Sequence, residues 1–175
     1  MPETPEKTPE LLADVEFWRQ PVLCLRGGHV RFSELLARKR AAEGEVLTPG
    51  AFMPEIEEAG MARALAHAAL ANAAAAAAKG SSVSVNLPRH FLGDREFVLG
   101  VRETMENLSA SARQRLVLEL TESGVADSAE KNHAHMLSGL RLALDDFGQE
   151  ASDLVSIATL PVSIVKFDKT FATGP

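Results

Sequence analysis

The chain has 175 residues and a net charge of −6, with 46% hydrophobic and 24% charged residues. This length allows one domain with a sizeable core, and the acidic balance argues against a broad basic surface for long nucleic acids. No stretch reaches the ~18 apolar residues that a membrane span requires, and the N-terminus lacks the pattern of a signal peptide. The single cysteine, Cys24, excludes an intramolecular disulfide. We therefore expect a cytoplasmic globular protein.

The first part of the chain predicts a short helix, a β-hairpin and a helical region. Glu10–Arg19 has an amphipathic pattern that favours a helix. Val22–Leu25 and His29–Ala37 are strand candidates on either side of a Gly-Gly turn, which indicates a hairpin. Pro49–Lys79 is rich in alanine and is expected to be mostly helical.

From residue 82 onward, predicted strands and helices alternate. The strand candidates are Ser82–Leu87, Arg115–Thr121, Leu140–Phe147 and Val162–Phe167. The helical segments between them are Pro88–Leu108, Ser128–Ser138 and Ser152–Thr159. Such alternation predicts a parallel sheet covered by helices, which right-handed crossovers curl into a doubly wound sheet or a barrel.

Polar side chains of types that bind metals or act in catalysis recur at the ends of these strands. They are Glu34 with Arg38, Asn86, Glu119 with Glu122, Asp145 with Asp146, and Lys166. In parallel barrels the carboxyl ends of the strands form the active face, so we expect these side chains to converge there. Carboxylate and amide oxygens suit Mg²⁺ or Mn²⁺, and paired divalent ions are used for phosphodiester cleavage. A lysine beside them can orient water or hold a phosphate oxygen.

Each of these residues also has a structural interpretation. A lone carboxylate at a strand end is often solvated, and Thr121 can cap a following helix. The neighbours Asp145 and Asp146 are harder to explain structurally, because burying unpaired charge inside an apolar strand is unfavourable. On a regular strand they point to opposite faces, so a kink is needed to bring both to one site.

Seven short segments between residues 20 and 171 form a recognisable set. They are QPV (20–22), ELLAR (34–38), TPGAFMPEIEEAG (48–60), SVSVNL (82–87), LELTES (118–123), LDDFG (144–148) and PVSIVKFDKTF (161–171). Their sequences and their order resemble those of the EAL domain family, in which ELLAR takes the place of EALLR.

The resemblance implies a TIM-like (β/α) barrel with an antiparallel first strand, and hydrolysis of cyclic di-GMP to linear pGpG with Mg²⁺ or Mn²⁺. It implies that the first metal ion is bound by Glu34, Asn86, Glu119 and Asp145. The second would be bound with the help of Asp145 and Asp146. The resemblance further implies that Lys166 positions the attacking water, that Arg38 and Gln20 lie at the ligand, and that Glu122 steadies the loop after the fifth strand.

The chain departs from the family pattern in two places. The family continues with a seventh and an eighth strand, whereas this chain ends at Pro175, and residues 149–154 read QEASDL where the family has TGYSSL. We therefore expect residues 1–19 to form a tail and a short helix. Residues 20–175 would form an EAL-like domain of about six strands that lacks the last two barrel strands.

These departures favour a non-catalytic or weakly active binding or regulatory module of cyclic di-GMP signalling. One alternative is an active Mg²⁺- or Mn²⁺-dependent phosphodiesterase. Another is a protein-interaction scaffold that binds no nucleotide. Because an incomplete barrel leaves open sheet edges, we also expect a homodimer partner or another protein to cover them.

Overall fold

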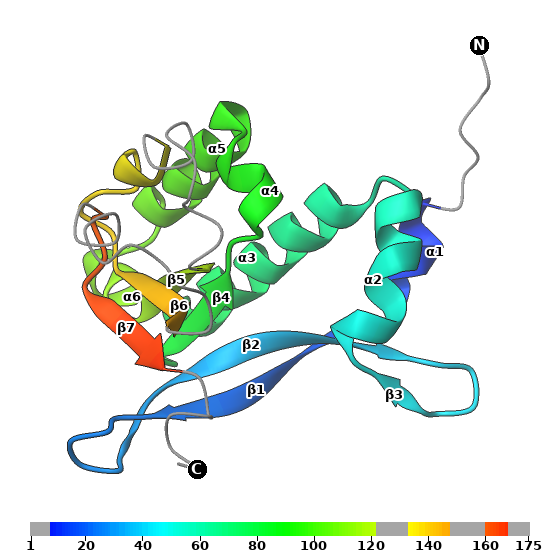
Figure 1. The fold of residues 1–175 in the computed structure, drawn as a ribbon, viewed down its shortest axis with the longest axis horizontal. Coiled ribbons are helices and arrows are strands. Elements are labelled where there is room, and N and C mark those ends of the chain that lie inside the picture. The colour runs from blue at the N-terminus through cyan, green and yellow to red at the C-terminus, as the bar shows by residue number, and fades with distance from the viewer. Residues whose placement is uncertain (1–7, 122–132, 148–159, 168–175) are drawn as a thin grey trace.

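The computed structural model describes residues 8–121, 133–147 and 160–167. Its centre is a sheet in the strand order β1-β2-β4-β5-β6-β7, with the short β3 paired to β2 (Figure 1). The strands are β1 (Val15–Leu23), β2 (Val30–Arg40), β3 (Val46–Leu47), β4 (Val83–Asn86), β5 (Leu116–Thr121), β6 (Leu142–Phe147) and β7 (Ile164–Phe167). The helices are α1 (Thr8–Ala13), α2 (Pro49–Glu58), α3 (Ala62–Ala78), α4 (Arg89–Leu92), α5 (Arg95–Glu106) and α6 (Ala110–Arg113).

The sheet confirms the predicted fold class, an incomplete TIM-like α/β barrel. β1 is antiparallel to β2, whereas β2, β4, β5, β6 and β7 follow one another in parallel. Within the described residues the sheet does not close, and β1 and β7 are its two edges. The helical region Pro49–Lys79 is confirmed as α2 and α3, which are separated by Ala59, Gly60 and Met61.

The prediction of a helix over Glu10–Arg19 was wrong in its second half. The helix α1 ends at Ala13, and residues from Val15 onward belong to β1. Val15 and Phe17 pair with residues of β2 and pack beside the cluster around Phe52 and Ile56. Pairing along the whole length of β2 supplies more backbone hydrogen bonds than another helical turn, so the tertiary contacts outweigh the local pattern.

Side chains alternate strictly between the two faces of the parallel strands. On β5, Leu116, Leu118 and Leu120 point outward into the core that α3 and α5 cover. Between them, Val117 and Glu119 point inward. The inward apolar residues of neighbouring strands form a barrel floor, which comprises Phe32, Val117 and Ala143 with Val22 and Ile164 packed against them. This alternation lets one strand serve the core and the interior of the barrel together.

Two predicted helices fall largely outside the described residues. Of Ser128–Ser138, the structure describes helical backbone at His133, Ala134 and His135, and Ser152–Thr159 lies outside altogether. β3 was not predicted from the sequence. No helix in the described part of the chain has both the length and the apolar character needed to cross a membrane.

The central strand β5 should carry much of the stability. Leu118 is fully buried in the outer core, so we expect Leu118→Ala to lower the free energy of unfolding by about 2–5 kcal/mol in urea denaturation. Leu99 on α5 is 40% exposed, and Leu99→Ala is the matched control with an expected loss below ~1 kcal/mol. Equal losses in the two variants would contradict the assignment of this core.

Candidate metal and ligand site

The candidate site lies one layer above the barrel floor. On four strands, the residue two positions beyond a floor residue is charged and also points inward. The pairs of floor and site residues are Phe32 with Glu34, Val117 with Glu119, Ala143 with Asp145, and Ile164 with Lys166. Because all four strands are parallel, these side chains meet at the carboxyl edge of the sheet, as the sequence predicted.

Lys166 joins the three carboxylates of this layer. Its Nζ lies 2.9 Å from Glu34 Oε2, 2.6 Å from Glu119 Oε2 and 2.9 Å from Asp145 Oδ2. One oxygen from each carboxylate lies within 4.8 Å of the others. Asn86 joins the group by donating a hydrogen bond from Nδ2 to Glu34 Oε1, at 2.8 Å. Five of the predicted site residues are therefore brought together from five different strands.

Burial makes the electrostatics of this layer strong. Glu119 is fully buried, and burial together with the nearby Glu34 raises the pKa of its carboxyl to about 7, against the lowering effect of Lys166. Burial alone would lower the pKa of Lys166, but Glu119, Asp145 and Glu34 outweigh that effect and raise it. Lys166 is therefore positively charged at neutral pH, and burial makes ionisation of Glu119 unfavourable.

Glu119 also retains unused binding capacity. Its Oε1 and the buried Oγ of Ser84 have no hydrogen-bond partner among the described residues, although Ser84 is near enough to lower the pKa of Glu119. A buried acceptor without a partner is uncommon in proteins. The three carboxylates, which include this Glu119 oxygen, and the amide of Asn86 form a set of hard oxygen donors of the kind that Mg²⁺ or Mn²⁺ prefers. The residues present therefore fit a divalent cation.

The kink expected at Asp145 and Asp146 is present. The pairing of β6 with β7 shifts register between Leu144 and Phe147, and Asp146 has a φ of +57°. The Asp146 amide donates a hydrogen bond to Asp145 Oδ1 at 2.9 Å. Asp146 is not among the three carboxylates of the close cluster, so its role in a second metal site stays a prediction.

The remaining predicted residues lie at the margin of this layer or outside the described chain. Gln20 is directly opposite Glu34 in the β1–β2 register and is exposed. Arg38 lies four residues beyond Glu34 on β2, where its Nη1 donates to Ala37 O at 2.8 Å. Glu122 lies outside the described residues. The sequence analysis missed Ser84, which alternation could have found because it lies two residues before Asn86 on the inward face.

An apolar cavity of about 300 Å³ adjoins the site. Asn86 lines it, together with Phe17, Leu36, Met53, Pro88 and Phe91. It lies where β2 and β4 end and where α2 and α4 begin, so it is next to the carboxyl edge of the sheet. A cavity with mainly apolar walls and the polar side chains of Asn86 and His90 suits a flat heterocycle with hydrogen-bonding groups.

The fold and the site together define a barrel-like α/β protein with an oxygen-rich cation site at the carboxyl edge of its parallel strands. The model of the EAL domain family matches residues 11–174. The chain therefore belongs to the EAL domain family.

Two curated relatives and one solved structure illustrate this similarity. The chain is 31% identical to the uncharacterized protein y4lL of Sinorhizobium fredii over 90% of its own length and 20% of that protein. It is 29% identical to the cyclic di-GMP phosphodiesterase RocR of Pseudomonas aeruginosa, over 90% of this chain and 43% of RocR. The solved PaMucR phosphodiesterase in complex with c-di-GMP has a TM-score of 0.76 and 25% identity, and it covers 95% of this chain and 71% of that one. The chain thus spans less than half the length of these curated relatives.

The raised pKa of Glu119 predicts a pH-dependent difference between the protein and Glu119→Gln. A carboxyl whose pKa is higher in the folded protein than in the unfolded chain stabilises the protein at low pH. That contribution to the free energy of unfolding is lost as the pH rises toward the pKa of the folded protein, here about 7. The glutamine variant lacks this titration. Between pH 5 and pH 8, we therefore expect the free energy of unfolding of Glu119→Gln to rise by roughly 1–3 kcal/mol relative to that of the unsubstituted protein, as measured by urea denaturation. Glu103→Gln, on the exposed side of α5, is the control and should show no such trend.

The backbone at Asp146 predicts which side chains it tolerates. A φ of +57° is accessible to asparagine but unfavourable for β-branched residues. The free energy of unfolding of Asp146→Val should therefore be about 1–2 kcal/mol lower than that of Asp146→Asn, as measured by thermal or urea denaturation. Equal stability of the two variants would show that the backbone at this position is not in the left-handed region.

Proposed function

We propose that this chain binds cyclic di-GMP at the carboxyl edge of its sheet, with a divalent cation held by Glu34, Asn86, Glu119 and Asp145. The observation that carries the proposal is the convergence of these side chains and Lys166 from five strands, with a buried Glu119 oxygen that has no partner among the described residues. The names of RocR and of the PaMucR complex support cyclic di-GMP as the ligand class.

Each part of the site would act on a different part of the ligand. A cyclic dinucleotide has two phosphodiesters and two purine bases, so it needs cationic groups and apolar walls close together. When bound, the cation would polarise a phosphoryl oxygen and activate water. Lys166 would donate from its ammonium to a water or phosphate oxygen, and Arg38 would contact a phosphate at the margin. The apolar cavity beside Asn86 would hold a base and exclude water from it.

We further propose that the chain acts chiefly as a binding or regulatory module with weak or no turnover. The segment QEASDL at residues 149–154, in place of the TGYSSL found in the family, supports this view. The alternative of an active phosphodiesterase is favoured by the match of Lys166 and the three carboxylates to the expected catalytic layer. A scaffold that binds no nucleotide is the outcome left if neither ligand nor cation binds. Cytoplasmic location and the covering of the open sheet edges by a partner stay predictions.

Isothermal titration calorimetry with cyclic di-GMP, in Mn²⁺ and in EDTA, tests the proposal. Glu34 accepts hydrogen bonds from both Asn86 and Lys166, so Glu34→Gln should disturb the cation set with little change in shape. We expect EDTA and Glu34→Gln each to weaken binding of cyclic di-GMP at least about ten-fold. Mutation of residues that hold or support a metal site typically lowers metal affinity by this much. The control Glu103→Gln should bind as the unsubstituted protein does.

Chromatography of the same mixtures separates binding from turnover. Intact cyclic di-GMP after incubation with Mn²⁺ is the result expected for a binding module. Linear dinucleotide that forms with the unsubstituted protein but not with Glu34→Gln would establish the phosphodiesterase instead. Binding that is indifferent to both EDTA and Glu34→Gln would contradict the proposed site.

A further inference from the structure

The turn between β1 and β2 exposes aliphatic side chains at the opposite edge of the sheet from the site. Leu23 is 57% exposed, Leu25 is 79% exposed and Val30 is 56% exposed. β2 begins at Val30 and reaches the site at Glu34, so the turn belongs to the amino edge of the parallel strands. The barrel chemistry proposed above makes no use of these side chains.

The turn is closed by its own backbone hydrogen bonds. The Cys24 amide donates to His29 O at 2.9 Å, and the Gly28 amide donates to Cys24 O at 2.8 Å. Gly28 has a φ of +65°, a left-handed backbone conformation that glycine adopts more readily than residues with a side chain. The aliphatic residues are therefore presented by an ordered turn.

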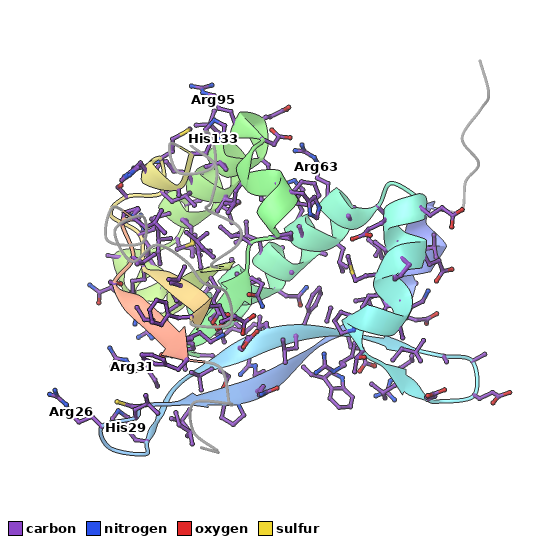
Figure 2. The ribbon with its side chains drawn as sticks, in the orientation of Figure 1. Arg26, His29, Arg31, Arg63, Arg95 and His133 are labelled. Carbon is purple, nitrogen blue, oxygen red and sulfur yellow. The ribbon has the colours of Figure 1, made fainter. Side chains whose placement is uncertain are left out.

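Positive charge surrounds the exposed aliphatic residues. From Phe17 to Ser33 the chain has three arginines and no aspartate or glutamate, although its net charge is −6. Figure 2 shows Arg26 and His29 projecting from the turn, with Arg31 near β7. Neither Arg26 nor Arg31 forms an ion pair with a residue that the structure describes.

Another arginine, from a different part of the chain, lies close to this group on the same edge. Arg141 immediately precedes β6, and its pKa is lowered by burial and, to a lesser extent, by the charge of Arg31. Arg26 and Arg31 also line a cavity of about 400 Å³, whose other walls include apolar residues of β1 and β7 and Lys166 of the candidate site. Guanidinium groups so close together, with no carboxylate paired to Arg26 or Arg31 in the described part of the chain, would favour an anionic partner.

We propose that the β1–β2 turn docks this protein on an anionic lipid bilayer, with Leu25 and Val30 inserted among the lipids and Arg26 and Arg31 at the phosphate headgroups. An apolar tip flanked by cations combines the two terms that drive interfacial binding, buried apolar area and attraction to anionic lipids. A protein partner is less well matched, because the turn projects outward and has none of the aromatic side chains that anchor protein interfaces.

Docking in this orientation keeps the candidate site accessible. Glu34 lies four residues along β2 from Val30, or about 13 Å at the rise of a strand. The amino edge would face the bilayer while the carboxyl edge faces water. The proposal does not depend on cyclic di-GMP, so its failure would leave the proposed function unchanged.

Vesicle flotation provides the first test. We expect the protein to float with vesicles that contain 30% phosphatidylglycerol and to bind pure phosphatidylcholine at least ten times more weakly. Arg26→Ser and Arg31→Ser should each lower the partition coefficient about five-fold, the factor that corresponds to one cationic side chain at an anionic surface. Leu25→Ser should lower it by a similar or larger factor. Leu99→Ser, on α5, is the matched control and should not change it.

The single cysteine allows a second test that needs no substitution. Cys24 lies within the turn and is partly exposed, so an environment-sensitive fluorophore can be attached there specifically. We expect a blue-shifted, brighter emission on phosphatidylglycerol vesicles, and quenching by lipids that carry a spin label near the headgroup. Circular dichroism of each variant verifies that it is folded.

Three results would overturn the proposal. The first is equal binding to neutral and anionic vesicles, and the second is an unchanged emission from labelled Cys24. The third is that the protein binds soluble polyglutamate but not vesicles, and that Leu25→Ser does not weaken this binding. That result would indicate an acidic protein segment as the partner.

Discussion

The contact of one ammonium with three carboxylates is the constraint on which the inner layer of this barrel depends. Lys166 lies within 2.9 Å of oxygens from Glu34, Glu119 and Asp145, which come from three other strands. Without a cation, the buried carboxylate of Glu119 and the half-buried carboxylates of Glu34 and Asp145 would repel one another with little water to screen them, which is unfavourable. The chain therefore supplies a cation of its own. A divalent ion at the same oxygens would share them with Lys166, so metal affinity and the stability of this layer are coupled.

The sequence allowed the fold class and most of the site to be predicted, because both follow from periodicity. Alternation on β5 and β6 places leucines outside and Glu119 and Asp145 inside, and parallel strands bring equivalent positions to one edge. Family motifs then specified which of these positions matter. Asn86 and Lys166 are both predicted by these motifs.

Other features depend on contacts between distant segments and could not be predicted locally. The helical pattern of Glu10–Arg19 gave way to β1 because Val15 and Phe17 find partners on β2, some twenty residues away. That Glu119 Oε1 has no hydrogen-bond partner among the described residues depends on where Ser84 and Lys166 lie. A kink at Asp145 and Asp146 was expected, but its form was not: the left-handed backbone at Asp146 accompanies a register shift against β7, which lies outside any local window.

The amino and carboxyl edges of the sheet, where its parallel strands begin and end, have different chemistry. At the carboxyl edge, three inward carboxylates accept hydrogen bonds from Lys166, and the amide of Asn86 donates to Glu34. At the amino edge, Arg26 and Arg31 have no carboxylate partner among the described residues. Pairing with a carboxylate would stabilise exposed cations of this kind by only ~0–1 kcal/mol, so the fold does not require it. Unpaired cations beside exposed aliphatic side chains instead combine the two forces on which the proposed contact with an anionic bilayer depends.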